Sequence, residues 1–150
     1  MTIPTPNILL AEDNPVNQKM TLIVLKKLGL KADTANNGQE VLTAMTEHVY
    51  DLVLMDIQMP EMDGIEATRI IRERWPHGPK IIVVTSFEAD MCRDLCYDAG
   101  ADDFLNKPVR IEELGAAIER NLSITHPTMA HREPSNTMDA SLQAFSKSPA

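Results

Sequence analysis

Acidic residues stand at two places in the sequence where a run of apolar residues ends. Glu12 and Asp13 follow the run at residues 7–11, and Asp56 ends the run at residues 52–56. Three carboxylates folded into one place would repel one another by about 4 kcal/mol per pair at roughly 4 Å and an effective dielectric constant of about 20. A hard divalent cation offsets that repulsion, and Mg²⁺ typically binds through one or two carboxylates, water and a phosphate. The pattern therefore predicts a Mg²⁺ site with Glu12 and Asp13 as its anchors.

Two more polar residues stand at or just after later apolar runs. Thr85 ends the run at residues 80–85, and Lys107 follows the run at residues 103–106. Beside a metal ion, Asp56 is a candidate nucleophile on phosphorus, because carboxylates form acyl phosphates in covalent catalysis. The cation would shield the charge and orient the transferring group. Lys107 would pair with one phosphoryl oxygen and Thr85 would donate a hydrogen bond to another.

These residues are positioned by an alternation of short β-rich runs and helix-length segments. The helices should end near Gly29, Gly78 and Gly100, since glycine commonly follows a helix. The predicted strands cover residues 7–11, 31–35, 52–56, 80–85 and 103–106. The predicted helices cover Pro15 to Leu28, Gly38 to His48, Gly64 to Arg74, Ala89 to Ala99 and Arg110 to Asn121.

The first, third and fourth strands are nearly continuous Leu, Ile and Val, which is typical of a parallel sheet covered by helices on both faces. We therefore predict an α/β protein with a doubly wound, five-stranded parallel sheet. Right-handed crossovers leave few arrangements, and the flavodoxin-like order 2-1-3-4-5 accommodates five strands. That order brings the carboxyl ends of the strands, with Glu12, Asp56, Thr85 and Lys107, to one crevice.

The composition sets the domain organisation. The 150 residues, 43% of them hydrophobic, suffice for one domain with a real core. We expect residues 1–122 to form that domain and the Ser-, Thr- and Pro-rich residues 123–150 to be a mostly disordered tail or linker. Met138, Leu142 and Phe145 have helical spacing, which fits either a short docking helix within the tail or the beginning of a further domain.

The charge and the cysteines exclude several classes of protein. A net charge of -8 disfavours nonspecific binding to nucleic acid or to an anionic membrane. No apolar run approaches the roughly 20 residues of a membrane span, and the start of the chain has no signal-peptide pattern, so we expect a cytoplasmic protein without direct membrane insertion. Cys92 and Cys96 form no CxxC pair, which favours buried thiols over a metal or redox site. The sequence gives no signal for the oligomeric state.

Four motifs in this alternation strongly resemble the receiver domain of two-component response regulators, over about residues 7 to 122. They are "LLAEDNPVNQ" with the acidic pair, "DLVLMDIQMPEMDG" with Asp56, "IIVVTS" with Thr85, and "GADDFLNKP" with Lys107. The resemblance is greatest to receivers that belong to, or cooperate with, hybrid histidine kinases. It implies a phosphoacceptor: Asp56 takes a phosphoryl group from the phosphohistidine of a histidine kinase or histidine phosphotransfer protein, with Mg²⁺ as cofactor. Such a domain is a signalling switch or relay with self-catalysed chemistry, and not a conventional enzyme.

The resemblance also implies roles for further residues. The main-chain carbonyl of Gln58 should bind the metal together with Glu12, Asp13 and Asp56, and the peptide bond before Pro108 should be cis. Thr85 and the strand aromatic, here Phe104, should move on phosphorylation. Phe104 lacks a phenolic hydroxyl, so a core phenylalanine is an equally good interpretation.

Two predictions come from individual side chains. Phe87, two residues after Thr85, should hinder water at the phosphoryl group and lengthen the life of the phosphorylated state. On the first helix, the apolar face of Val16, Met20, Ile23, Val24 and Leu28 should pack on the sheet. Leu22 and Leu25 fall elsewhere. They form either a docking patch for a kinase or phosphotransfer helix bundle, as the first helix does in the family, or a contact with the neighbouring last helix.

Three other functions compete with phosphoacceptance. A dehalogenase-type phosphatase needs a second Asp two residues after the nucleophile, where this chain has Gln58, so no general acid is present for a leaving group. A flavodoxin-like cofactor binder needs a hydroxyl- or Gly-rich loop after the first strand, where this chain has carboxylates. A receiver that serves only as a scaffold remains a third alternative, against which stand the intact acidic pair, Asp56, Thr85 and Lys107.

Overall fold

The computed structural model describes residues 5–86 and 89–122, in which five parallel strands alternate with five helices. The strands are β1 (Ile8–Ala11), β2 (Ala32–Ala35), β3 (Leu52–Met55), β4 (Lys80–Thr85) and β5 (Asp103–Asn106). The helices are α1 (Pro15–Lys27), α2 (Gly38–Glu47), α3 (Gly64–Arg74), α4 (Ala89–Ala99) and α5 (Ile111–Leu122). Each bound lies within one residue of its prediction.

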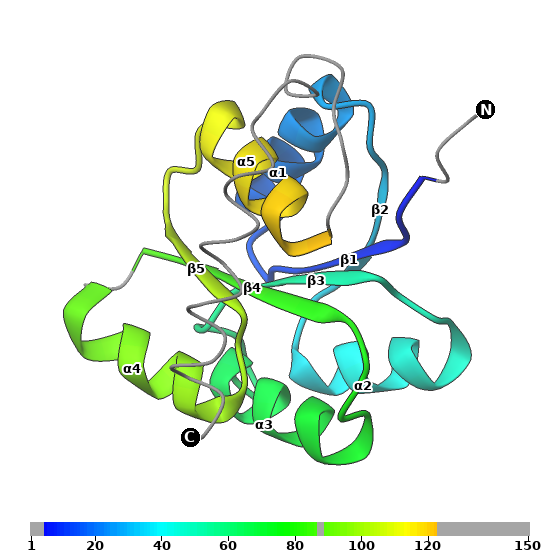
Figure 1. The fold of residues 1–150 in the computed structure, drawn as a ribbon, viewed down its shortest axis with the longest axis vertical. Coiled ribbons are helices and arrows are strands. Elements are labelled where there is room, and N and C mark those ends of the chain that lie inside the picture. The colour runs from blue at the N-terminus through cyan, green and yellow to red at the C-terminus, as the bar shows by residue number, and fades with distance from the viewer. Residues whose placement is uncertain (1–4, 87–88, 123–150) are drawn as a thin grey trace, which may run out of the picture.

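The strands form one sheet in the order β2-β1-β3-β4-β5, which confirms the predicted fold class. Helices α1 and α5 cover one face and α2, α3 and α4 cover the other, as Figure 1 shows. All four residues of β1 and of β3 are buried, as expected for strands covered on both faces. The parallel register sets Ala11 beside Met55, so the chain leaves β1 and β3 at neighbouring points of the same edge.

Short polar side chains fix where the helices begin. Asn14 caps α1 by accepting hydrogen bonds from the main-chain N–H groups of Val16 and Asn17, at 2.9 and 3.0 Å. Asp63 caps α3 in the same way through the N–H of Glu66. Such caps satisfy donors that have no partner inside the helix. They also fix the loops after β1 and β3, which carry the acidic residues.

Helix α1 is rotated relative to the prediction, and the proposed docking patch is wrong for Leu25. That side chain is 0% exposed and packs with Leu114 and Ile118 of α5. Leu22 is half-buried and packs against the same cluster, which favours the alternative contact with the last helix. The face predicted to pack on the sheet instead points partly to solvent, since Val16, Met20 and Ile23 are 66%, 56% and 47% exposed.

Several predictions concern other parts of the chain. Cys96 is buried, as predicted, whereas Cys92 is only half-buried, and both are free thiols. No helix among the described residues is long and apolar enough to cross a membrane. Phe87 and the tail at residues 123–150, with Met138, Leu142 and Phe145, lie outside the described residues.

Candidate phosphoacceptor site

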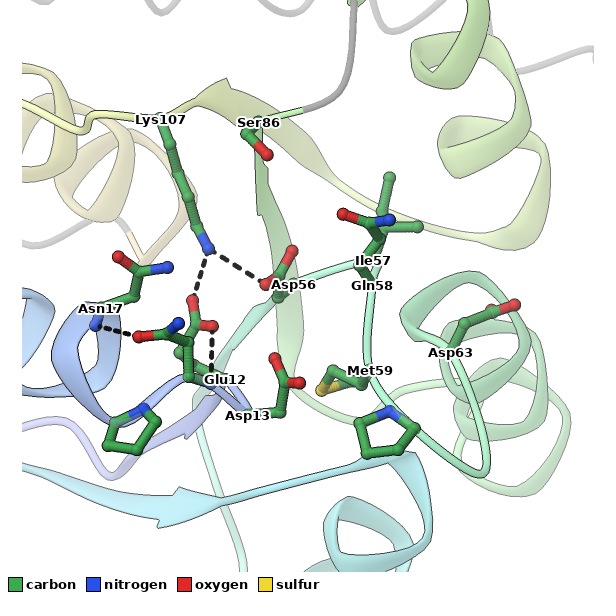
Figure 2. Close-up of a pocket in the computed structure, with 13 residues that line it drawn as sticks. Glu12, Asp13, Asn17, Asp56, Ile57, Gln58, Met59, Asp63, Ser86 and Lys107 are labelled. Atoms are coloured by element: carbon green, nitrogen blue, oxygen red, sulfur yellow. Dashed lines mark hydrogen bonds and ion pairs between the residues drawn. The ribbon is translucent and has the colours of Figure 1, made fainter.

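The predicted acidic residues meet in an open pocket at the carboxyl edge of the sheet. Glu12 and Asp13 come from the loop after β1, Asp56 from the end of β3, and Lys107 from the loop after β5, as Figure 2 shows. Their carboxylate oxygens come within 4.8 Å of one another. The polar ends of three separate segments are therefore brought together as the strand order predicts.

The carboxylates differ in their exposure to water. Glu12 is 2% exposed and Asp56 is 6% exposed, while Asp13 is open to solvent. Buried carboxylates are costly unless they are paired or hydrogen-bonded. Lys107 supplies that pairing, because its ammonium group contacts Glu12 Oε1 and lies 3.0 Å from Asp56 Oδ2. Figure 2 shows both contacts as dashed lines.

The electrostatics of Lys107 reflect this position. Burial alone lowers the pKa of an ammonium group, but hydrogen bonds and charge attraction from Glu12 and Asp56 outweigh it, so the pKa of Lys107 lies above its usual value. Lys107 therefore stays protonated throughout the physiological range. It is a permanent cation beside Asp56, in the place where a phosphoryl oxygen of an acyl phosphate would need one.

The cluster carries more negative charge than Lys107 can neutralise. Three carboxylates face one ammonium group, which leaves a surplus of two negative charges (3 − 1 = 2). All the acidic donors are oxygens and one of them, on Asp13, is exposed, so an ion can bind while it keeps several water ligands. Hard divalent cations prefer such a donor set. The residues present therefore fit a divalent metal site.

Neighbouring polar residues hold Glu12 in place, and they were not predicted as site residues from the sequence. The main-chain N–H of Asn14 donates to Glu12 Oε2 at 3.1 Å. The Gln18 amide donates to the main-chain carbonyl of Glu12 at 2.9 Å and reaches Asn36 at 3.3 Å. Asn14 carried a usable signal, since Asn followed by Pro marks the start of a helix. Gln18 carried none, because its contact depends on the turn before α1.

Asp56 is fixed through its main chain. Its N–H donates to the carbonyl of Ala11 at 3.0 Å, and the N–H of Gly64 donates to the carbonyl of Ile57 at 2.9 Å. A Cβ at position 64 would lie 2.0 Å from the carbonyl oxygen of Asp56. Only glycine lets the first residue of α3 approach the end of β3 so closely.

The other predicted site residues lie nearby. Gln58 lines the pocket, and metal binding by its carbonyl stays a prediction. Thr85 ends β4 and is 1% exposed, and the next residue, Ser86, lines the pocket. The peptide bond between Lys107 and Pro108 is cis, as the resemblance implied. Phe104 is 6% exposed and belongs to the core, so both interpretations of that residue are compatible with its position.

Comparison with protein families decides the identity of the domain. The model of the response regulator receiver domain matches residues 8–119. This chain belongs to that family. The matched region contains Glu12, Asp13, Asp56, Thr85 and Lys107, so the receiver carries every residue of the predicted phosphorylation site.

The curated relatives are much longer signalling proteins. The receiver is 38% identical over 127 residues to hybrid signal transduction histidine kinase K of Dictyostelium discoideum, which covers 79% of this chain and 10% of that protein. It is 42% identical over 120 residues to histidine protein kinase 1 of Candida albicans, covering 71% of this chain and 5% of that protein. The chain thus spans a tenth or less of the length of these two relatives.

Solved receiver structures have the same fold. The receiver domain of a sensor histidine kinase from Pseudomonas aeruginosa PAO1, with a magnesium ion coordinated in its active site cleft, is 34% identical with a TM-score of 0.74, covering 81% of this chain and 100% of that one. The co-crystal structure of the Saccharomyces cerevisiae phosphotransfer protein Ypd1 with the receiver domain of Ssk1 matches at 29% identity and a TM-score of 0.72, covering 79% and 90%.

Proposed function

We propose that this receiver takes a phosphoryl group onto Asp56 in a Mg²⁺-dependent reaction and acts as a switch or relay in a phosphorelay. The observation that carries the proposal is the surplus of carboxylate charge around Asp56, with one Lys107 ammonium group in direct contact. A Mg²⁺ ion on Glu12, Asp13 and the Gln58 carbonyl would offset that charge and orient the phosphoryl group. The cytoplasmic location and the extent of the domain, residues 1–122, remain predictions.

The residues of the receiver have separable tasks in this reaction. An Asp56 carboxylate oxygen attacks phosphorus, the new O–P bond forms as the bond to the donor's histidine nitrogen breaks, and the departing imidazole keeps the bonding electron pair. Lys107 neutralises one phosphoryl oxygen, and Thr85 donates a hydrogen bond to another. Because the donor carries the leaving group, the receiver needs no general acid of its own at position 58.

The test is intact-mass measurement after incubation with Mg²⁺ and acetyl phosphate. We expect a gain of one phosphate in the wild type, none in Asp56→Asn, and none when EDTA removes the metal. Asp51→Asn is the matched control. Asp51 directly precedes β3 and Asp56 directly follows it, so the two carboxylates lie at opposite ends of the strand, and Asp51 is exposed. A metal-independent gain, or a gain retained in Asp56→Asn, would contradict the proposal.

The exposed apolar face of α1 replaces the predicted docking patch. Val16, Met20 and Ile23 face solvent. Beside them an apolar groove runs between Met20 and Val24 of α1 and Pro108 of the β5–α5 loop, and Asn17, Ser86 and Lys107 line both this groove and the acidic pocket. A partner seated on this face therefore reaches Asp56 directly. We infer that a histidine phosphotransfer protein or kinase helix bundle docks here. The co-crystal structure of Ypd1 with the similar Ssk1 receiver supports the kind of partner.

The charge of α1 indicates the kind of partner. The helix carries Lys19, Lys26 and Lys27, all exposed, and contains no Asp or Glu, although the whole chain has a net charge of -8. A partner with acidic residues around an apolar patch would be attracted to this helix and repelled by the rest of the surface. This local contrast would fix the orientation of docking.

Phosphotransfer from phosphorylated Ypd1 tests the docking face. Met20→Asp should slow transfer at least tenfold and leave phosphorylation by acetyl phosphate unchanged, because only the protein donor needs the surface. Val49→Asp is the matched control, since Val49 is an 84% exposed apolar side chain at the opposite end of the sheet. Equal transfer rates for Met20→Asp and the wild type would contradict the proposal that partners dock on α1.

A further inference from the structure

The ring of Phe104 in the edge strand β5 is covered by a charged side chain. The guanidinium carbon of Arg93, on α4, lies 5.3 Å from the centre of the Phe104 ring. Phe104 itself is 6% exposed, whereas Arg93 is exposed. A guanidinium group at this distance from an aromatic face is within the range of a cation–π interaction.

The ion pairs closest to this part of the sheet involve Arg72 with Asp102 and Arg120 with Asp103. The nearby carboxylate, on Asp103, is bound by Arg120 at 2.7 and 3.0 Å. Arg120, and not Arg93, therefore neutralises Asp103.

The electrostatics of Tyr97, one turn further along α4, support this placement of the charge. Burial, and next the charge of Asp103, raise the pKa of the Tyr97 hydroxyl, and the positive charge of Arg93 acts in the opposite direction. Arg93 is thus close to both aromatic side chains.

The strand that carries the ring also carries the cation of the site. Phe104 pairs with Val83 and Asn106 pairs with Thr85, and the N–H of Lys107 donates to the Thr85 carbonyl at 2.9 Å. Lys107 then contacts Asp56. A movement of the ring that shifts β5 would therefore reach Lys107 within three residues.

We propose that Arg93 is a positioning residue that holds the Phe104 ring in its buried orientation while Asp56 is bound directly to Lys107. Phe104 lacks a hydroxyl that could fix the ring by a hydrogen bond, so packing and the guanidinium group set the orientation. The inference rests on the proposed function for its link to Asp56. The contact with Arg93 makes the buried orientation of the Phe104 ring the favoured one before any phosphoryl group is bound.

Fluorine NMR of protein labelled with fluorophenylalanine tests this proposal. The chain contains 3 phenylalanines, and Phe104→Leu assigns the signal of interest by its disappearance. We expect a dominant buried-ring signal and a minor outward-ring signal in the wild type. In Arg93→Gln the population ratio of outward to buried ring should rise roughly two- to fivefold, the amount that a partly exposed cation–π contact supplies. Arg93→Lys, which keeps a cation, should fall between the two.

Two controls separate a specific effect from a general one. Arg69→Gln removes an exposed arginine from α3 and should leave the Phe104 signal unchanged. Addition of Mg²⁺ and beryllofluoride, an acyl-phosphate analogue, should return the ring of Arg93→Gln to the buried signal and alter the wild-type signal little.

An Arg93→Gln signal identical to that of the wild type would overturn the proposal, as would an equal change in Arg69→Gln. If Arg93→Gln does not fold, as far-UV circular dichroism would show, Arg93→Lys and Arg93→Met take its place with the same expected direction. These spectra need no phosphodonor, so a failure of Asp56 to gain phosphate would contradict the proposed function and leave the ring measurement valid.

Discussion

The two ends of the sheet each hold one half-buried cation, but the groups around it differ. At the carboxyl end, Lys107 faces Glu12 and Asp56, with Asp13 adjacent. At the amino end, Arg72 donates to the carbonyls of Gly100 and Pro79 and pairs with Asp102.

The charge balance separates the two ends. Arg72 and Asp102 cancel, and Asp102 gains a second donor from the N–H of Ile81 at 2.9 Å. Arg72 and Asp102 therefore have their partners without help from solution. The carboxyl end keeps a surplus of negative charge that only an added cation can neutralise. We therefore predict that the amino end serves stability and that the carboxyl end serves binding and chemistry, and the following experiments test that division.

Replacing Lys107 should have the largest effect on function. Lys107→Met removes the cation that would stabilise charge on the transferring phosphoryl group, so the rate of phosphorylation by acetyl phosphate should fall about 100- to 1000-fold. Intact mass measured over time gives the rate. Lys80→Met, at the exposed amino end of β4, is the control and should phosphorylate at the wild-type rate.

Replacing Arg72 should have the largest effect on stability. Arg72→Met keeps the aliphatic stem but removes hydrogen bonds of 2.9 and 2.8 Å and the ion pair to Asp102, so the free energy of unfolding should fall by about 2–3 kcal/mol. Urea unfolding gives this value. The phosphorylation rate of the folded variant should stay within about threefold of the wild type, and a loss as large as that of Lys107→Met would break the proposed division. Arg69→Met, on an exposed face of α3, should change stability by less than about 0.5 kcal/mol.

Metal ions should stabilise the receiver through the carboxyl end alone. At about ten times its Kd, Mg²⁺ should raise the free energy of unfolding by roughly 1.4 kcal/mol, and EDTA should reverse the gain. Asp13→Asn should lose most of this increment because it removes a ligand from the cluster. Asp102→Asn should keep it in full. Calorimetric unfolding with and without Mg²⁺ distinguishes the two acids, and equal increments in both variants would refute a specific site.

The smallest expected effect on stability is that of Tyr50, which also lies at the amino end of the sheet. The Tyr50 hydroxyl donates a hydrogen bond to Asp33 at 2.6 Å. Burial, and next this hydrogen bond, raise the pKa of Tyr50 to about 12 from its usual 10. The folded protein thus holds the phenol proton more tightly than the unfolded chain. The stability that Tyr50 contributes is complete below pH 10 and is lost as the pH rises through 12.

Tyr50→Phe should therefore lower the free energy of unfolding by about 1 kcal/mol at neutral pH. The difference between variant and wild type should shrink as the pH rises from 10 to 12. Urea unfolding at several pH values measures it. A difference that stays constant across this range would show that the phenol proton has no part in the stabilisation. Phosphorylation at neutral pH should be unaffected.

Much of the fold and the acidic site could be predicted from the sequence, because both depend on strongly patterned residues. The apolar runs before Glu12 and Asp56 define strands, and a parallel order brings their ends together. The rotation of α1 could not be predicted in this way. Apolar residues lie on both sides of that helix, so periodicity alone placed Ile23 in the core, where the structure has it 47% exposed, and left open whether Leu25 is a docking residue or a contact of the last helix. The packing of α1 against α5 orients the helix, and this is a tertiary interaction that the sequence pattern does not show.

The contact of Arg93 with Phe104 could not be predicted from the sequence either. It joins side chains of a helix and a strand, and no sequence motif marks such a pair. The position of Lys107, in contrast, could be predicted, because this residue follows an apolar run and precedes a proline. Residues at strand ends are thus more predictable than residues that meet across elements.

Gly64 makes α3 and the acceptor strand a single mechanical unit. With no side chain between them, the first turn of the helix rests on the peptide group of Asp56, and any larger residue would have to push one of the two aside. Bending or sliding of α3 would accordingly move the acceptor carboxylate relative to Lys107. A ligand that binds the outer face of α3 would therefore change the rate at which Asp56 is phosphorylated, without touching the pocket itself.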